Sequence, residues 1–367
     1  MKIVMLGHKV VPSRSGGIEV VVQSLSKNLA DLGHRILLLN RKENSTQTSV
    51  PRLHNGIEVR SVPTIRIKGL AAVSSSLTAT IAAIRERPDV IHFHAIGPSF
   101  WIPLASLFNV RTVVTVHGLD WKRAKWGKFA SLYLKTAEKL LAKFADEVIV
   151  LSDSDRNYFL EEYQRETTIV PNAIDVSLAD ASHLLGKVPF TSPFILFVGR
   201  IVPEKGLHTL IEAYLSLGSD VPLVIAGDHS DSKDYYEEVR ALAKDVPSIH
   251  MIGHQSADQL AQLYTSCEIY VLPSTIEGMP MSLLEAISHG SCCVVSDIPE
   301  NIEVLQGAGS TFQTGNSFDL AARLRQLLEN QVLASEHRQK ASELSKRLPS
   351  WYDVAIHTSK VYERAVQ

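Results

Sequence analysis

The 367-residue sequence has few cysteines, no long apolar run and almost no net charge. Its three cysteines, Cys267, Cys292 and Cys293, form no C-x-x-C pair, and an odd number does not suit a disulfide framework. We therefore expect reduced thiols, with Cys292 and Cys293 buried as small apolar residues in a strand. No stretch approaches the roughly 18 consecutive apolar residues of a membrane-spanning helix. With 45% hydrophobic residues, the composition excludes a disordered or collagen-like chain.

The first residues do not fit a secretory signal peptide. Only Ile3 to Leu6 separate Lys2 from the polar run Gly7-His8-Lys9, whereas the apolar region of a signal peptide needs about 7–15 residues. We therefore expect a cytoplasmic protein, and a secreted solute-binding protein is disfavoured.

The net charge of −2 hides an asymmetry between the two halves of the chain. Residues 1–183 carry a net charge of +6 and residues 184–367 one of −8. The segment from Lys122 to Lys143 has seven basic residues and one acid, Glu138, so it accounts for the whole surplus of the first half. A local basic segment of this kind predicts either a surface that binds an acidic partner or a helix face exposed to solvent.

Short apolar strands alternate with helical patterns along both halves. Strands are expected at residues 2–6, 35–40, 90–94, 112–117 and 147–151, and again at 194–198, 222–226, 248–252, 269–272 and 292–296. This alternation is typical of parallel sheets covered by helices on both faces. Residues 171–193 break the pattern and predict a linker, so we expect an α/β protein of two Rossmann-like, doubly wound domains, 1–183 and 184–351, with the ligand in a cleft between them.

The loop after the strand at 194–198 reads Gly199-Arg200-Ile-Val-Pro-Glu-Lys205-Gly206. It places a guanidinium and an ammonium at the carboxyl end of a strand. Such a pair suits a diphosphate, because Arg binds bidentately and Lys supplies a compact charge. An ordinary solvated loop is the alternative.

A second constellation runs from Glu277 to Glu285. A helix is expected to begin near Pro280, because proline suits the first helical position. Free backbone N–H groups around Met279 to Ser282 would form an anion site at the start of that helix, although Pro280 itself has no N–H. The residues expected to bind the anionic ligand there are Gly278, Met279, Pro280, Met281 and Ser282. Two carboxylates flank it, and carboxylates accept hydrogen bonds from sugar hydroxyls. A cap and a surface helix residue are the alternative roles for them.

Three weaker signals lie in the first half. Gly16-Gly17 precedes a helix and would let a ligand approach the backbone closely. His117 ends a strand and could contact a substrate or move a proton, but taken alone the pattern favours a histidine that is simply hydrogen-bonded at the end of the strand. His92 and His94 alternate in a strand, but no third ligand has suitable spacing, so we expect no metal site.

The basic segment predicts an amphipathic helix. Five lysines fall within an arc of roughly 80° on that helix: Lys125, Lys128, Lys135, Lys139 and Lys143. A different face is expected to pack inward and carries Leu134, Ala137, Leu141 and Phe144. Phe129 and Leu132 lie on or beside the lysine face, which favours an interfacial membrane surface, with a solvated face as the alternative. Nucleic-acid binding is not expected, because one helix in a chain with a pI near 6.7 is a poor footprint.

In this order the motifs resemble glycosyltransferase family 4, a retaining group with the GT-B fold. The matching pieces are Gly16-Gly17, His117-Gly118, Pro171-Asn-Ala-Ile-Asp175, Gly199-Arg200 with Pro203-Glu-Lys205-Gly206, and Glu277-x7-Glu285. The region from His117 to Trp126 most resembles members that build bacterial exopolysaccharides, capsules and lipopolysaccharides. Met279-Pro280 stands where members often carry Phe-Gly, which leaves the donor sugar open, and Ala173 replaces a glycine common in the family.

The resemblance implies roles for individual residues. Arg200 and Lys205 would hold the diphosphate of a nucleotide-sugar donor, Glu277 would contact the donor sugar near its 3- and 4-hydroxyls, and Glu285 would hold the ribose hydroxyls. His117 would lie near the reacting carbon.

The Gly16-Gly17 loop would approach the phosphate and the acceptor side, and the last helix, 352–367, would cross back onto the first domain. The resemblance further implies a glycan or lipid-linked acceptor, no metal and no cofactor. The leaving phosphate would help to take the acceptor proton, with His117 or Asp120 able to assist. An epimerase on the same fold, or a non-catalytic nucleotide-sugar-binding subunit, stays open as an alternative.

Overall fold

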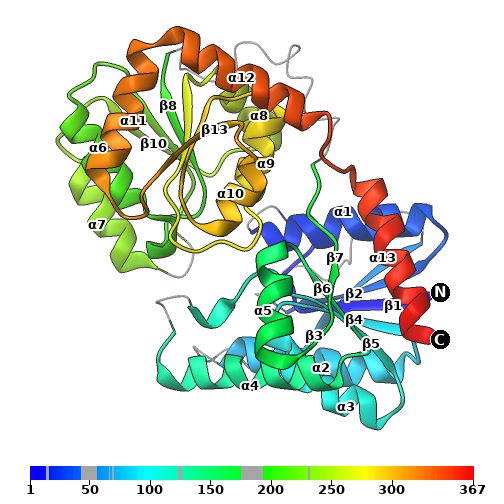
Figure 1. Ribbon diagram of the computed structural model, residues 1–367. Coiled ribbons are helices and arrows are strands. Elements are labelled where there is room, and N and C mark those ends of the chain that lie inside the picture. The colour runs from blue at the N-terminus through cyan, green and yellow to red at the C-terminus, as the bar shows by residue number, and fades with distance from the viewer. Residues whose placement is uncertain are drawn as a thin grey trace. The chain divides into compact units, whose positions relative to one another are not determined.

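The protein forms two compact units, each built on one parallel sheet (Figure 1). The computed structural model describes residues 1–13, 16–42, 56–65, 67, 70–122, 126–174, 193–229 and 232–367. The first unit comprises residues 1–172 and 349–367, and the second comprises residues 173–348. The domain boundary predicted between residues 183 and 184, and Asp175 of the linker motif, lie outside the described residues.

The first unit contains a seven-stranded sheet in the order β3-β2-β1-β4-β5-β6-β7, with every neighbouring pair parallel. Its strands are β1 (Lys2–Leu6), β2 (Arg35–Arg41), β3 (Ile57–Val62), β4 (Val90–His94), β5 (Arg111–Thr115), β6 (Glu147–Val150) and β7 (Thr168–Ile169). Its helices are α1 (Gly17–Asp31), α2 (Leu70–Arg85), α3 (Ile102–Leu107), α4 (Lys128–Phe144), α5 (Asp153–Tyr163) and α13 (Trp351–Val366).

Helices cover both faces of this sheet. Side chains of α2 to α5 pack with β1, β4 and β5 in one apolar cluster that includes Val4, Phe93 and Val114. Helix α13, from the end of the chain, lies beside α1 (Figure 1) and packs on β4, β5 and β6. It begins where the sequence predicts a break, because Ser350 caps it and forms a capping box with Asp353.

The second unit contains a six-stranded parallel sheet in the order β10-β9-β8-β11-β12-β13. Its strands are β8 (Ile195–Val198), β9 (Leu223–Ala226), β10 (Ile249–Gly253), β11 (Ile269–Leu272), β12 (Cys293–Ser296) and β13 (Gly309–Phe312). Its helices are α6 (Leu207–Leu217), α7 (Lys233–Ala243), α8 (Ala257–Ser266), α9 (Met281–Ser288), α10 (Pro299–Leu305), α11 (Ser317–Glu329) and α12 (Gln331–Ser345).

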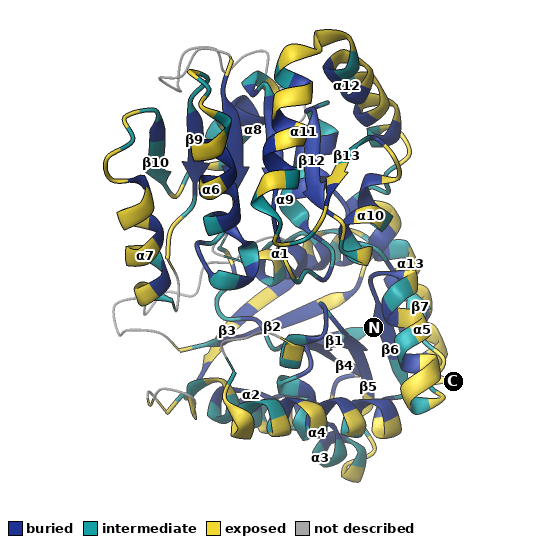
Figure 2. Ribbon diagram, turned by 60° about the vertical axis from the view of Figure 1, so that its left-hand side comes forward, coloured by how far each residue is buried: buried dark blue, intermediate teal, exposed yellow. Residues whose placement is uncertain are grey.

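Two apolar clusters, one with α6, α7 and α11 and one with α8, α9, α10 and α12, hold this second sheet. The inner strands β8, β9, β11 and β12 are buried, while the helices expose their outer faces (Figure 2). All three cysteines are free and buried, and burial raises the pKa of Cys267 and Cys292 to about 12. The prediction of two parallel-sheet domains with structural, unreactive cysteines is therefore confirmed.

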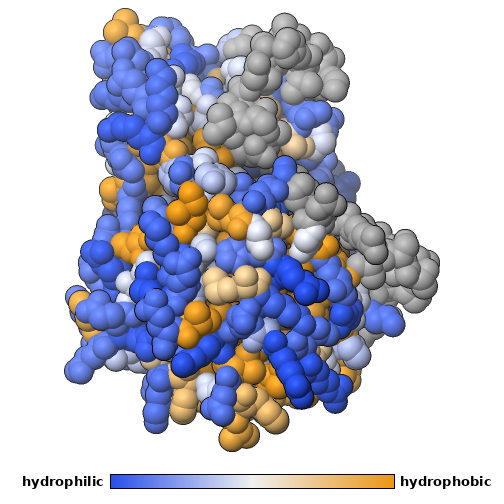
Figure 3. All heavy atoms as spheres, turned by 90° about the vertical axis from the view of Figure 1, so that its right-hand side faces the viewer, coloured by the Kyte–Doolittle hydropathy of each residue, from blue (hydrophilic) through white to orange (hydrophobic). Residues whose placement is uncertain are grey.

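No helix in the described part of the chain is long and apolar enough to span a bilayer. One face of the surface, drawn in Figure 3, carries mostly hydrophilic side chains with separate hydrophobic groups among them.

Candidate active site

Two loops of the second unit bring Lys205 and Glu277 together. Lys205 Nζ lies 2.6 Å from Oε1 of Glu277, and only 14% and 9% of the two side chains are exposed. Ser274 donates its hydroxyl to the same oxygen at 2.6 Å. Among the described residues, Oε2 of Glu277 has no hydrogen-bond partner. One carboxylate oxygen is therefore saturated inside the protein while the other remains available to a ligand.

The backbone of the two loops fixes this pair. Gly206, which follows Lys205, has φ +63°, and a Cβ there would lie 2.0 Å from the carbonyl oxygen of Pro273. Only glycine therefore permits both the conformation and the approach. Thr275 N donates to the carbonyl of Glu204 at 2.9 Å, which joins the loop after β8 to the loop after β11.

Arg200 stands at the carboxyl end of β8, in the same loop as Lys205. Its side chain is partly exposed and makes no hydrogen bond or ion pair with any described residue. Its carbonyl accepts a hydrogen bond from Val202 N at 3.1 Å, which shapes the turn. Among the described residues, no carboxylate neutralises this guanidinium, so its charge is available to an anionic ligand.

Helix α9 begins at Met281, one residue later than a first-turn proline would place it, because Pro280 is the N-cap with extended backbone. The N–H groups of Leu283 and Leu284 bond back to Pro280 O, at 3.1 and 3.2 Å. Those of Met281 and Ser282 have no acceptor among the described residues. Two free N–H groups at the positive end of a helix dipole make the predicted anion position chemically competent.

The rest of this segment packs inward. Gly278 and Pro280 are buried, and Met279 and Met281 pack against the apolar cluster of α8, α9, α10 and α12. The hydroxyl of Ser282 accepts a hydrogen bond from Tyr270 at 2.9 Å.

Glu285, on α9, lies one turn further along than the free N–H groups. The buried Tyr264 donates its hydroxyl to Glu285 Oε2 at 3.1 Å. Burial and the Glu285 carboxylate raise the pKa of Tyr264 well above its ordinary value, so the phenol stays a donor. The geometry fixes the orientation of Glu285, and its assignment to ribose hydroxyls stays a prediction.

In the first unit, Gly16 is the N-cap of α1 and Gly17 is its first residue. Glu19, in the first turn of α1, is buried, and its Oε1 accepts a hydrogen bond from Lys9 N at 2.9 Å. A Cβ on Gly16 would lie 2.5 Å from Oε2 of Glu19. The glycine therefore has a local packing reason, and its predicted contact with phosphate and acceptor stays a prediction.

His117 follows β5, and its ring Nε2 lies 3.1 Å from Nδ1 of His94 at the end of β4. His92, two residues before His94 on the same face of the strand, lies between Tyr362 and Thr115, each 2.7 Å away. The rings of His92 and His94 have centroids 4.1 Å apart. Three imidazoles thus form a row at the carboxyl edge of the sheet.

Burial keeps these rings neutral. It lowers the pKa of His117 to about 4 and that of His92 to about 3. The pKa of His94 falls well below the ordinary value, because burial is reinforced by neighbouring imidazoles. The described residues contain no group of three or more His, Cys, Asp or Glu side chains arranged to hold a metal ion.

The predicted basic helix is α4. Lys128, Lys135, Lys139 and Lys143 lie on it, and Lys125 lies outside the described residues. Leu134, Ala137 and Leu141 are buried as predicted, and Phe129 and Leu132 are 91% and 65% exposed. Phe144 was expected to pack inward but is 38% exposed, with Lys143 Nζ 5.2 Å from its ring centroid.

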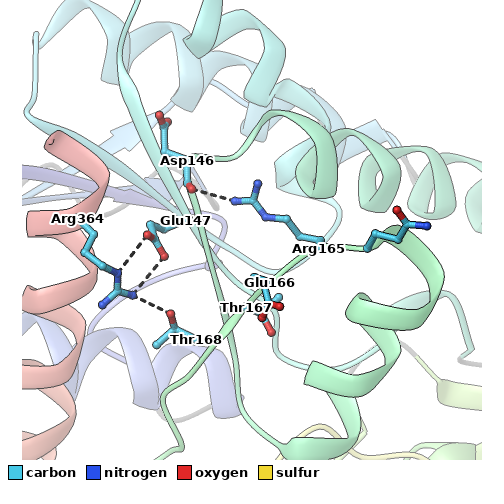
Figure 4. A pocket seen from close by; sticks show the side chains of 8 residues that line it. Asp146, Glu147, Arg165, Glu166, Thr167, Thr168 and Arg364 are labelled. Carbon is cyan, nitrogen blue, oxygen red and sulfur yellow. Dashed lines mark hydrogen bonds and ion pairs between the residues drawn. The ribbon is translucent and has the colours of Figure 1, made fainter.

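One groove of the first unit, of about 530 Å³, lies at the amino edge of β6 and β7 (Figure 4). Arg364 donates to Glu147 at 3.2 and 3.3 Å and to Thr168 at 2.7 Å, and Arg165 donates to two main-chain carbonyls. Its arginines are thus bonded to the protein itself. Because His117 lies at the opposite, carboxyl edge of the same sheet, this groove is not part of the predicted site.

Sequence reasoning missed three groups that contact the predicted residues. Ser274 and Glu19 carried no predicted role, and His94 was considered only as a metal ligand. Ser274 bonds to Glu277 in its own loop, Glu19 bonds to Lys9 in the preceding loop, and His94 contacts His117 on the neighbouring strand's end. The signal available for each was its position at the carboxyl end of a strand or the start of a helix.

The sequence matches two glycosyltransferase families. Residues 15–178 match the family described as Glycosyltransferase Family 4, and residues 186–347 match Glycosyl transferases group 1. A glycogen synthase of Mycobacterium tuberculosis is 28% identical over 400 residues, which cover 99% of this chain and 94% of the relative. The gpi3 subunit of a phosphatidylinositol N-acetylglucosaminyltransferase of Schizosaccharomyces pombe is 26% identical, covering 95% of this chain and 77% of the relative.

Solved structures share the fold. A sucrose-phosphate synthase from Thermosynechococcus elongatus aligns with a TM-score of 0.85 at 20% identity, covering 99% of this chain and 98% of that one. The Anabaena protein HepE, solved with UDP and glucose, aligns with a TM-score of 0.79 at 19% identity, covering 98% of each chain. The chain therefore belongs to glycosyltransferase family 4 and is an enzyme with the GT-B fold.

Proposed function

We propose that the enzyme transfers a sugar from a nucleotide-sugar donor to a hydroxyl of a glycan or lipid-linked acceptor, with retention of anomeric configuration, in the assembly of a bacterial exopolysaccharide, capsule or lipopolysaccharide. The observation that carries this proposal is the pair of Lys205 and Glu277, held between two loops of the second unit. The same loops carry the guanidinium of Arg200, and helix α9 begins with the N–H groups of Met281 and Ser282; none of these groups has a partner in the part of the chain that the structure describes.

Donor cleavage explains why such groups stand together. When the anomeric C–O bond breaks, negative charge develops on the departing nucleoside diphosphate. Arg200, Lys205 and the N–H groups of Met281 and Ser282 are fixed positive groups that stabilise this charge without reorganisation. Lys205 has three N–H donors and uses one on Glu277, so two remain for phosphate oxygens.

Glu277 serves the sugar in this scheme. Its Oε1 is occupied by Lys205 and Ser274, and its Oε2 accepts from a donor hydroxyl. Glu285 accepts from the ribose hydroxyls of the nucleotide. In the first unit, the Gly16-Gly17 turn serves the phosphate and the acceptor side, and His117 serves the donor sugar and the reacting carbon. The leaving phosphate takes the acceptor proton, so no protein carboxylate is needed as a general base.

The relatives support the substrate class. HepE has been solved with UDP-glucose, and the similar curated proteins include a glycogen synthase and an alpha-maltose-1-phosphate synthase of Mycobacterium tuberculosis. These similar proteins are named for the synthesis of a sugar polymer or a sugar phosphate, or were solved with an activated sugar. They leave the donor base and the sugar of this enzyme open, and so does its Met279-Pro280 segment.

A ligand panel followed by a transfer assay tests the proposal. Unfolding temperature is measured with nucleoside diphosphates and their sugars, since a ligand at 100 times its Kd adds about 2.7 kcal/mol to the free energy of unfolding. The stabilising donor is then incubated with membrane extracts or oligosaccharides, and NMR of the product reads the anomeric configuration. Stabilisation by a nucleoside diphosphate, together with a product that keeps the anomeric configuration of the donor, supports the proposal. Absence of any stabilising nucleotide contradicts nucleotide-sugar use, and inversion contradicts retention.

We also propose that the lysine face of α4, defined by Lys128, Lys135, Lys139 and Lys143, docks on an anionic membrane. The exposed Phe129 and Leu132 give it apolar groups that enter the headgroup region, and four ammonium groups complement acidic lipids. Lys135 Nζ also lies 4.5 Å from the ring centroid of Trp121, which keeps that indole beside the basic face.

Co-sedimentation with vesicles containing phosphatidylglycerol tests this surface. Binding should weaken at high salt and when Lys128, Lys135 and Lys139 become Glu, because exposed charges are screened. The matched control changes Lys27, Lys42 and Lys360, three exposed lysines of the same unit, to Glu. Equal loss in both triple variants, or indifference to salt, would reject a specific docking face.

A further inference from the structure

The row of histidines in the first unit ends in an asymmetric contact. His117 is partly exposed, and its Nε2 faces Nδ1 of His94 at 3.1 Å. Its other ring nitrogen, Nδ1, has no hydrogen-bond partner among the described residues. His94 is fully buried, and its own second nitrogen, Nε2, is also without a partner. One proton lies between the two rings, and it belongs either to Nδ1 of His94 or to Nε2 of His117. Which ring donates it determines which nitrogen of His117 carries a proton.

The surroundings of His94 indicate which ring is the donor. If His117 donated to His94, the proton of His94 would sit on Nε2, as a buried N–H without an acceptor. If His94 donates from Nδ1, its Nε2 is a bare lone pair instead. Buried N–H groups without a partner are the rarer of the two in folded proteins, so the second arrangement is favoured.

A neighbouring histidine follows the same rule. The amide of Asn40 is oriented by Val11, because Oδ1 accepts from Val11 N at 3.1 Å and Nδ2 donates to Val11 O at 2.8 Å. His8 Nε2 lies 2.8 Å from that Oδ1 and must donate to it. The nitrogen of His8 that is buried without a partner is therefore Nδ1, which is bare.

The backbone holds His94 in place. Ala95, the next residue, has φ +79°, which a non-glycine residue rarely adopts, and its N–H and carbonyl are bonded to Thr115 O and Ser99 Oγ at 2.9 Å each. A Cβ on Gly7 would lie 2.1 Å from the carbonyl oxygen of His94, so the ends of β1 and β4 meet closely. Strain held by this many contacts is common at functional sites.

We propose that His94 is a positioning residue for sugar transfer: it donates its Nδ1 proton to Nε2 of His117 and thereby leaves His117 with a proton on Nδ1, the nitrogen that is open to a substrate oxygen. This inference rests on the proposed function. It makes His117 a neutral hydrogen-bond donor to a sugar or acceptor oxygen. It also removes His117 as the base that takes the acceptor proton, because a ring that already carries a proton on its open nitrogen cannot accept one there.

The tautomer can be observed without any activity. Long-range proton–nitrogen NMR spectra of the full chain, labelled with ¹⁵N-histidine, distinguish the two neutral forms, and the His117→Ala variant assigns the signal. We expect His117 to carry its proton on Nδ1 in the unmodified chain at pH 7. In His94→Phe, which has no donor, the signal should become that of a mixture. A proton on Nε2 of His117 in the unmodified chain would overturn the proposal.

Kinetics supply the second readout. His94→Phe should lower kcat about tenfold, the equivalent of one lost neutral hydrogen bond, with KM for the donor unchanged. His94→Asn, whose amide N–H can replace Nδ1–H, should restore most of kcat. His357→Asn, an exposed histidine on α13, is the matched control. Full kcat in His94→Phe would also overturn the proposal. If the unmodified enzyme transfers no sugar at all, the proposed function fails, and the NMR result alone decides the role of His94.

Discussion

At the carboxyl edge of the second unit's sheet, Lys205 and Glu277 meet as a charged pair 2.6 Å apart, whereas at the same edge of the first unit's sheet His94 and His117 meet as neutral rings 3.1 Å apart. Both edges are formed by loops after parallel strands of the same strand order. The fold therefore supplies the position in each case, and the side chains supply the chemistry.

In the proposed transfer reaction, the two edges would serve different steps. A departing diphosphate gains charge, and fixed cations and helix N–H groups stabilise it. Hydroxyl groups carry no charge, and a neutral imidazole can bond to them without attracting phosphate or a counter-ion. Burial keeps the imidazoles in that state by lowering the pKa of His8 and His117 to about 4.

The largest expected effect is on the charged edge. Lys205→Met should lower kcat/KM for transfer by about 10²- to 10³-fold, as the loss of one group that stabilises transition-state charge does. Steady-state kinetics with the stabilising donor measure this. Lys244→Met, an exposed lysine at the end of α7, removes the same charge and should leave kcat/KM unchanged. A near-parental rate in Lys205→Met would break the comparison.

A smaller effect is expected at the partner of that lysine. Glu277→Gln should lower kcat/KM by about 10- to 100-fold, the value of one hydrogen bond to a charged group. Because the two side chains act as a unit, the double variant Lys205→Met/Glu277→Gln should be little worse than Lys205→Met alone. A double-mutant cycle measures this coupling, and strict additivity would mean that the pair does not function together.

Much of this architecture could be predicted from sequence. Continuous apolar runs such as Ile3 to Leu6 mark the central strands, which lie within a residue or two of the predicted positions. Three of the edge strands, β3, β7 and β13, were missed for physical reasons, whereas the edge strand β10 was predicted. β3 alternates buried and exposed residues, β7 has two residues, and β13 begins Gly-Ser-Thr with little apolar content.

The site divides in the same way. Lys205 and Glu277 could be found because their loops have recognisable spacing. His94 could not be assigned, because its role comes from a hydrogen bond to His117, which only the folded backbone brings near. Ser274 lies three residues before Glu277, but its hydrogen bond depends on the conformation of the loop between them. Glu138, a lone acid in a basic run, is likewise a buried acceptor for Trp121, Tyr158 and Tyr163.

Acid should destabilise the first unit, which carries His8, His92 and His117, before it destabilises the second. The pKa values of His8 and His117 are about 4 in the folded protein, and that of His92 is about 3, all below the ordinary 6.5. The unfolded chain therefore binds more protons, and stability is complete above pH 6.5 and falls progressively as the pH drops toward 4. Hydrogen exchange should show the first unit opening before the second.

A matched pair of variants tests that assignment. His8→Gln keeps a donor for Asn40 Oδ1 but does not titrate, so it should flatten the loss of stability between pH 6.5 and 4. His357→Gln, on the exposed face of α13, should leave the profile unchanged. Identical slopes in the two variants would show that the buried histidines do not control acid sensitivity.

The smallest expected effect concerns the hydrogen bond between the last helix, α13, and the buried histidines of the first unit. Tyr362 of α13 lies 2.7 Å from His92 Nδ1, and both groups are fully buried. Tyr362→Phe keeps the ring and leaves that nitrogen without its partner, so it should lower the free energy of unfolding by about 1–2 kcal/mol. Urea unfolding measures this, with Tyr352→Phe, exposed on the same helix, as the control. An equal effect in both would mean that α13 covers the sheet by apolar packing alone, and the neutral edge would then end at β4 and β5.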